Sequence, residues 1–167
     1  EQSLRHQALH DVLTGLPNRI LLRHRTDEAA VRAGERLAML VIDLDDFKPI
    51  NDVHGHSVGD AVLVEVAARI REAVGIAGIA GRLGGDEFAV ACAGLGNTTD
   101  GWILADRVVA AVGRPIRVGD ITVAVGASIG VAMGIQPLIP SLLIQRADEA
   151  MLEAKHAGKN TVKIAAD

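Results

Sequence analysis

The sequence predicts an α+β domain in which a mixed, mostly antiparallel central sheet is flanked by helices. Helical stripes and short apolar runs alternate along the chain, which is typical of helices packed on a sheet. Two hairpin signals, at Gly84–Gly85 and Gly119–Asp120, interrupt this alternation and indicate antiparallel neighbours. The 167 residues, 49% of them hydrophobic, suffice for one domain with its own core.

Short sequence patterns place the elements. The spacing of Leu63, Val66 and Ile70 is that of a helix with one buried face, and the run from Leu37 to Ile42 has no polar alternation, which favours a strand buried on both faces. We expect residues 54–60 to form a glycine-bearing loop and Ser141 to cap the last helix. Helices are expected at 1–10, 20–32, 47–53, 60–74, 98–112 and 141–157, and strands at 37–42, 76–83, 88–92, 116–118, 121–125, 127–133 and 161–164.

Composition excludes several classes of function. The net charge of −4 provides no overall positive field for a polyanion, and the 2% of aromatic residues gives poor support for base stacking, so we expect no nucleic-acid partner. The single cysteine, Cys92, fits a reducing compartment. No apolar run approaches the roughly 18 residues of a membrane span. We therefore expect a cytoplasmic domain without direct membrane contact, although a longer protein could be tethered to a membrane.

Acidic residues gather around the first hairpin signal. Asp86 and Glu87 follow the paired glycines and are expected at the hairpin tip, where adjacent carboxylates repel one another. A solvated turn would explain the same residues, because Gly and Asp are common in turns. Asp43 ends the apolar run of residues 37–42, where it could instead cap the next helix. If both segments are neighbours in one sheet, Asp43 and Asp86 face one point, and hard oxygen ligands favour Mg²⁺ or Mn²⁺ over zinc.

Four stretches of the chain resemble one family. Residues 84–88 read GGDEF, 11–19 read D-x-L-T-G-L-P-N-R, 43–52 read D-x-D-x-F-K-x-x-N-D and 55–60 read G-H-x-x-G-D. With these motifs the chain resembles the GGDEF-domain diguanylate cyclases of bacteria from Asp11 to Asn160. The resemblance implies a nucleotidyl-cyclase or polymerase-palm core, related to the ferredoxin-like arrangement. It also implies that residues 1–10 end an upstream signalling helix or linker and that 11–167 form the catalytic domain.

The resemblance assigns roles to individual residues. It implies that Asp43 and Asp86 hold the metal with help from the Leu44 carbonyl, and that Asp86 or Glu87 accepts the proton. Asn51 and Asp60 would read guanine by hydrogen bonds, and His56 would contact the substrate. The phosphates would be bound by Lys48, Lys155 and Lys159 and by main-chain amides that include that of Phe47.

Two departures from the family pattern affect expected properties. Lys159 stands where the family has Arg in a K-x-x-G-R-N pattern, so the charge is kept but the two-pronged hydrogen bonding is lost. Gly75 and Gly78 stand where many members carry an R-x-x-D site at which the product inhibits the enzyme. We therefore expect this domain to lack product inhibition through that site.

The implied reaction is the condensation of two GTP molecules into cyclic di-GMP with release of two pyrophosphates, through two-metal catalysis. Because one chain holds one GTP, the resemblance implies a homodimer with facing active sites. An upstream sensor or regulatory domain is expected in the full-length protein. The alternative is a regulatory module that binds GTP and controls a neighbouring domain, such as a phosphodiesterase.

Overall fold

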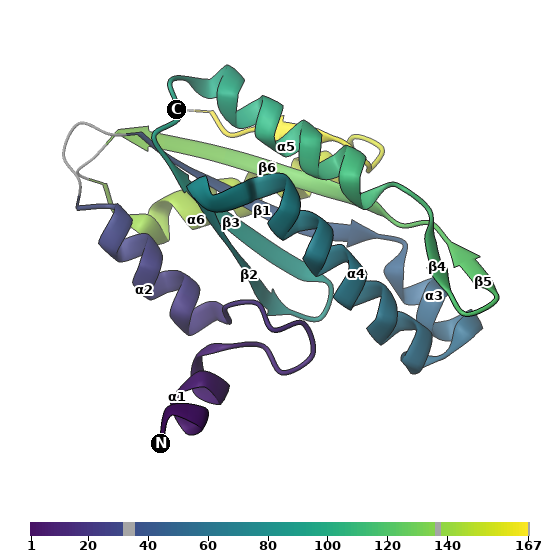
Figure 1. Ribbon diagram of the computed structural model, residues 1–167. Helices are drawn as coiled ribbons and strands as arrows, with labels where there is room; N and C mark the ends of the chain where they lie inside the picture. Colours follow the sequence, from purple (N-terminus) through teal and green to yellow (C-terminus); the bar gives the residue numbers. More distant parts are fainter. Residues whose placement is uncertain (32–35, 136–137, 167) are drawn as a thin grey trace.

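A mixed sheet forms the centre of the molecule (Figure 1). The computed structural model describes residues 1–31, 36–135 and 138–166. Within them, the five strands of this sheet are, in spatial order, β2 (Gly78–Gly84), β3 (Glu87–Ala93), β1 (Arg36–Asp45), β6 (Gly126–Ile135) and β7 (Val162–Ile164). The first four pair antiparallel with their neighbours and β7 runs parallel to β6, which confirms the predicted fold class.

Helices cover both faces of this sheet. α4 (His56–Val74) and α5 (Thr98–Val112) pack with one set of strand residues, and α2 (Arg19–Ala29) and α6 (Pro140–His156) pack with the other. Strand side chains alternate between faces, so Leu40 and Ile42 of β1 join the first cluster whereas Met39 and Val41 join the second. α4 and α5 connect consecutive strands across the same face, which is the ferredoxin-like arrangement.

β1 is buried on both faces from Leu37 to Ile42, as its unbroken apolar run predicts. The strand continues to Asp45, however, so Asp43 lies within β1 and does not cap the next helix. Asp43 and Asp45 are odd-numbered, like Met39 and Val41, and therefore project toward the face that α6 covers. The polar end of β1 is thus directed toward the helix that carries Lys155.

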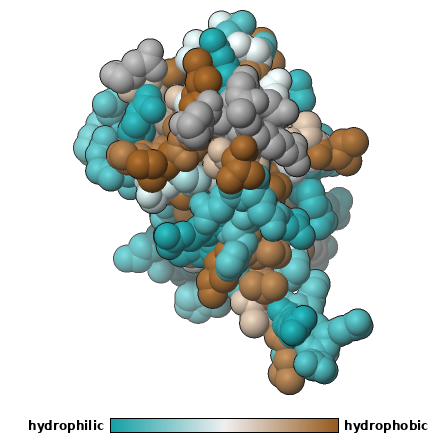
Figure 2. Space-filling model, turned by 90° about the vertical axis from the view of Figure 1, so that its left-hand side faces the viewer, coloured by the Kyte–Doolittle hydropathy of each residue, from teal (hydrophilic) through white to brown (hydrophobic). Residues whose placement is uncertain are grey.

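Small elements surround this core. They are α1 (Gln2–Leu9), α3 (Phe47–His54), the 3₁₀ turn η1 (Gly75–Ala77) and the β4 (Ile116–Val118) and β5 (Ile121–Val123) hairpin. α1 extends away from the body of the molecule (Figure 1). Figure 2, which faces the side of α1 and α2, shows hydrophobic residues in separate patches among hydrophilic ones. No helix in the described ranges combines the length and the hydrophobicity that a membrane crossing requires.

The prediction of a loop at residues 54–60 is wrong. α3 ends at His54 and α4 begins at His56, so Gly55 alone separates the two helices. Gly55 has a φ of 89°, a conformation that glycine adopts without steric penalty, and this allows the chain to change direction in one residue. His56 and Asp60 therefore lie on the first turns of a helix.

Other boundaries also differ from expectation. α6 is capped by Ile139 with Pro140 in its first turn, where the missing N–H of proline is not needed, so Ser141 is not the cap. α2 ends at Ala29, short of the predicted 20–32, and Arg32 lies outside the described residues. Glu87 belongs to β3 and pairs with Gly84, so the hairpin tip consists of Gly85 and Asp86.

Candidate active site

The pairing of β1 with β3 brings the acidic segments together. Asp43 of β1 lies opposite Glu87 of β3, and the Leu44 amide donates a hydrogen bond to the Asp86 carbonyl at 3.1 Å. The turn between β2 and β3 depends on Gly84 and Gly85, whose φ angles of 145° and 50° few other residues adopt. The structure therefore places Asp43, Asp86 and Glu87 at one edge of the sheet, where β1 ends and β3 begins.

These carboxylates influence one another electrostatically. Burial raises the pKa of Asp86, and the negative charge of Asp43 raises it further. Burial also raises the pKa of Glu87, with added repulsion from Asp148 on α6 and from Asp43, while Arg19 acts in the opposite direction. Acidic side chains whose charge is disfavoured in this way create a site that favours a cation.

Lys155 reaches this edge from the last turn of α6. Its ammonium group lies 2.9 Å from Asp43 Oδ1, 2.7 Å from Asp45 Oδ1 and 3.0 Å from the Leu44 carbonyl oxygen. Burial acts to lower the pKa of Lys155, but hydrogen bonds to Asp45 and Asp43 outweigh it and hold the pKa above its usual value. Lys155 is therefore a charged lysine whose position is determined by the end of β1.

Asp45 is a structural centre that connects several elements. Its side chain is only 4% exposed and accepts hydrogen bonds from Ser128 Oγ and the Asn160 amide, each at 2.7 Å, in addition to that from Lys155. These partners lie on β6, on the turn after α6 and on α6 itself. Asp45 thus joins the C-terminal end of α6 to the end of β1. Its motif position was visible in the sequence, but its partners were not.

α3 begins directly after β1 and carries further predicted residues. Asp46, with a φ of 59°, precedes the helix and forms an ion pair with Lys159 at 2.9 Å. Lys48 is exposed on the first turn, whereas the Phe47 side chain is buried in the core and so leaves only its main-chain amide for a ligand. The predicted cations therefore lie on α3, on the end of α6 and in the turn after it, and two of them, Lys155 and Lys159, pair with acidic residues at or just after the end of β1.

The predicted guanine-reading residues lie where α3 meets α4. Asn51 of α3 packs against Gly59 so closely that a Cβ atom at position 59 would overlap the Asn51 side-chain oxygen. Asp60 follows Gly59 and is exposed, as is His56 at the start of α4. The structure thus brings Asn51, His56 and Asp60 to one helix junction.

The donor set suits a hard divalent cation. Asp43, Asp86 and the Leu44 carbonyl offer only oxygen atoms, which Mg²⁺ and Mn²⁺ prefer. Among the described residues there is no group of three acidic, His or Cys side chains arranged to hold a metal ion. The protein alone would therefore supply part of the coordination sphere, as is usual for Mg²⁺, which also takes water and substrate phosphate oxygens.

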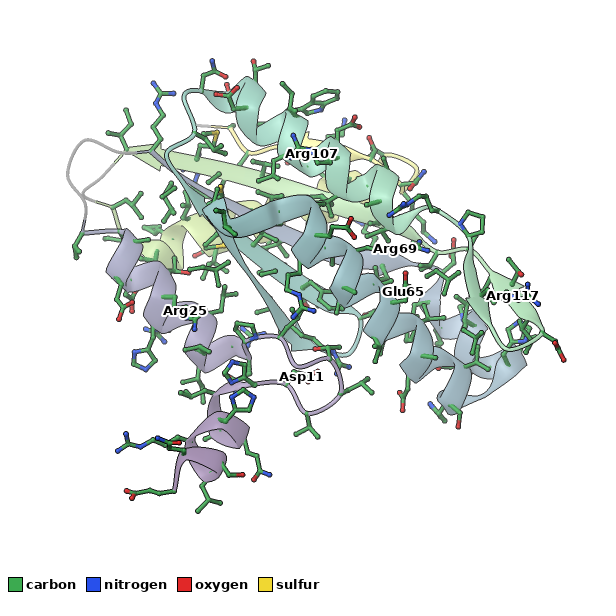
Figure 3. All side chains as sticks on the ribbon, viewed as in Figure 1. Asp11, Arg25, Glu65, Arg69, Arg107 and Arg117 are labelled. Carbon is green, nitrogen blue, oxygen red and sulfur yellow. The ribbon has the colours of Figure 1, made fainter. Side chains whose placement is uncertain are left out.

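An ion pair that the sequence analysis did not identify connects the β2–β3 hairpin to the segment between α1 and α2. The Arg82 guanidinium donates to both Asp11 carboxylate oxygens at 3.1 Å, and it also binds the Gly85 carbonyl. Figure 3 shows Asp11 in the connection between α1 and α2, beside the hairpin. Burial raises the pKa of Asp11, but hydrogen bonds from Thr14 and Arg82 outweigh it and lower the pKa. Asp11 opens the D-x-L-T-G-L-P-N-R motif and Arg82 lies two residues before GGDEF, yet only the fold brings them together.

Comparisons with known proteins show the family of this chain. The family model described as "Diguanylate cyclase, GGDEF domain" matches residues 8–161. The diguanylate cyclase TpbB of Pseudomonas aeruginosa is 43% identical over 168 residues, which cover 98% of this chain and 39% of TpbB. The chain thus spans well under half of that relative.

Two solved structures show the same fold. The GGDEF domain of YfiN or TpbB from Pseudomonas aeruginosa has a TM-score of 0.85 and 40% identity, covering 92% of this chain and 99% of that one. The coiled coil and GGDEF domain of DgcB from Caulobacter crescentus, in complex with c-di-GMP, has a TM-score of 0.89 and 27% identity, covering 98% and 89%. On its motifs, its fold and the match to the family model, this chain belongs to the diguanylate cyclase GGDEF-domain family.

Proposed function

We propose that this chain condenses two molecules of GTP into cyclic di-GMP and two pyrophosphates. The observation that carries the proposal is the pairing of β1 with β3, which joins Asp43 to the intact acidic hairpin beside Lys155. The activity of the relative TpbB, named a diguanylate cyclase, supports the same conclusion. A purely structural role would leave this arrangement of partly buried carboxylates and lysines unexplained.

The reaction joins each 3′-hydroxyl oxygen to the α-phosphorus of the other nucleotide and breaks the bond between the α- and β-phosphates. The hydroxyl proton passes to Asp86 or Glu87. In the metal-free chain, burial and neighbouring carboxylates raise the pKa of both side chains. Mg²⁺ or Mn²⁺ bound by Asp43, Asp86 and the Leu44 carbonyl would neutralise charge on the phosphoryl group and lower the pKa of the hydroxyl. Two-metal catalysis is part of this proposal.

The remaining site residues bind and orient GTP. Asp60 can accept hydrogen bonds from guanine N1–H and N2–H₂, and the Asn51 amide can serve another edge of the base. Adenine lacks this pair of donors and would leave the acceptor unpaired. His56 contacts the substrate beside them.

The phosphates are bound at the opposite end of the site. Lys48, Lys155 and Lys159 supply positive charge there, and the first amides of α3, including that of Phe47, face the anion.

Because each chain holds one GTP, the two nucleotides react only when two chains face each other, so we propose a two-fold homodimer. We also propose that residues 1–10 end an upstream signalling helix, that 11–167 form the catalytic domain, and that a sensor or regulatory domain lies upstream.

We further propose that the R-x-x-D type of product inhibition is absent. Gly75 and Gly78 cannot supply the arginine and carboxylate, and a Cβ at position 78 would lie 2.6 Å from Val74 Cγ1. Strong binding of cyclic di-GMP at this position, measured by calorimetry, would contradict the proposal.

The deciding experiment incubates the domain with GTP and Mg²⁺ and measures cyclic di-GMP by chromatography over a range of protein concentrations. We expect product, with a specific activity that increases with concentration because a dimer is required. Asp86→Ala should abolish product, whereas Asp106→Asn, an exposed acidic residue on α5, should not. Tight GTP binding without product at any concentration would support the regulatory module instead.

A further inference from the structure

Lys155 occupies the oxygen atoms that the proposed metal needs. Of its three acceptors, Asp43 Oδ1 and the Leu44 carbonyl oxygen belong to the proposed metal ligands. The third, Asp45 Oδ1, lies at the shortest distance, 2.7 Å. One lysine therefore connects the metal ligands to a neighbouring carboxylate that is not among them.

A divalent cation and an ammonium group at these oxygens would compete for them and repel each other electrostatically. Both bind to lone pairs of the same oxygen atoms, and two positive charges within a few ångströms repel strongly in a partly buried site. The Lys155 side chain is 21% exposed and that of Asp43 is 25% exposed, so water screens this repulsion only partly. In this position Lys155 would oppose the binding of a cation at Asp43 and Leu44.

Asp45 provides the position to which the lysine can withdraw. Ser128 and the Asn160 amide fix the Asp45 carboxylate, so it remains in place when Asp43 and the Leu44 carbonyl take another partner. Lys155 would then have two donor protons released for other acceptors, because an ammonium group carries three. In the proposed complex with GTP, phosphate oxygens would lie beside it.

We propose that Lys155 is an internal competitor of the divalent cation, held on Asp43 and the Leu44 carbonyl until the cation replaces it and frees it for the nucleotide phosphates. This inference rests on the proposed function for the identity of the phosphate ligand. The competition itself concerns only this chain and the cation. It makes Lys155 a residue whose removal strengthens metal binding although it weakens catalysis.

The test measures Mn²⁺ binding without nucleotide, by the paramagnetic resonance signal of free Mn²⁺. We expect Lys155→Met to tighten the dissociation constant about tenfold, the scale of one charge-assisted hydrogen bond. Lys163→Met is the matched control, since it removes the same charge from an exposed position on β7 and should leave binding unchanged. Equal or weaker Mn²⁺ binding by Lys155→Met would overturn the proposal.

A second measurement uses the wild-type chain and does not depend on the variant folding. The lysines of the chain are Lys48, Lys155, Lys159 and Lys163, so ¹³C labelling at Cε gives few signals, and Lys155→Arg identifies the one from Lys155. Addition of Mg²⁺ should shift the Lys155 signal and leave that of Lys163 in place. A Lys155 signal unchanged by saturating Mg²⁺ would refute the competition.

The two proposals fail in different ways. Tighter Mn²⁺ binding by Lys155→Met in a protein that never makes cyclic di-GMP would reject the proposed activity and retain the competition. Cyclic di-GMP production by the wild type, together with unchanged Mn²⁺ binding by the variant, would reject the competition alone.

Discussion

Gly59 leaves room for the Asn51 side chain, and replacing Gly59 with alanine should weaken substrate binding while leaving the stability of the fold nearly unchanged. The Cβ atom that Gly59→Ala introduces would overlap the Asn51 side-chain oxygen and lie 2.8 Å from Asn51 Cγ. Because these atoms belong to a side chain rather than to the backbone, the clash is relieved when the Asn51 amide rotates away. Gly59 itself is helical and does not need a left-handed conformation.

The expected size of each effect follows from this geometry. Displacing the amide removes its hydrogen bonds to the base, each worth about 0.5–1.5 kcal/mol, so GTP affinity should fall about tenfold. Alanine is preferred over glycine in a helix interior by about 0.5–1 kcal/mol, which offsets the cost of the new Asn51 rotamer. The free energy of unfolding should therefore change by less than about 1 kcal/mol.

The assay combines calorimetric titration with an unreactive GTP analogue and a urea unfolding curve. Gly101→Ala is the matched control, because it adds a methyl to a buried helical glycine of α5 whose nearest neighbour is the flexible Met133 side chain. We expect unchanged nucleotide binding in the control and reduced preference for GTP over ATP in Gly59→Ala. Wild-type GTP affinity in Gly59→Ala would refute the reasoning.

Three further predictions concern stability. Asp11→Asn should lower the free energy of unfolding by about 1 kcal/mol at pH 7. The pKa of Asp11 is lower in the folded state, so its contribution to stability is present above the usual value of 3.8 and is lost as pH falls through the folded pKa. Urea titrations at pH 7 and pH 2 measure this, and an equal loss of stability in Asp11→Asn at both pH values would contradict the prediction. Gly130→Ala should destabilise by about 3 kcal/mol or more, since its Cβ would overlap main-chain atoms of α6; a thermal melt showing a loss below about 1 kcal/mol would disprove this. Asp86→Asn should abolish cyclase activity but stabilise the fold at neutral pH, because the raised pKa of Asp86 makes its charged form unfavourable in the folded state. The gain in stability should vanish at a pH below the usual carboxyl range, where Asp86 is protonated in both states. Chemical unfolding at neutral pH and at that low pH checks this.

Local patterns in the sequence were sufficient for most of the fold. The apolar run of residues 37–42 predicted a strand buried on both faces, and the spacing of Leu63, Val66 and Ile70 predicted the buried stripe of α4. These predictions succeeded because burial on a strand or helix follows directly from residue spacing. The loop expected at 54–60 was wrong because one glycine with positive φ replaces what composition alone indicates as a longer connection.

The motifs also predicted which chemical groups form the candidate site. Their spacing from Asp43 to Asp52 and from Gly84 to Phe88 is a property of the sequence alone. Only the tertiary structure decided how distant groups meet: Asp11 with Arg82, Asn51 with Gly59, and Lys155 with Asp43. The physical reason is that these contacts depend on how helices and connections pack over the sheet and on turns such as the one at Gly55. Neither can be read from the local periodicity of a single segment.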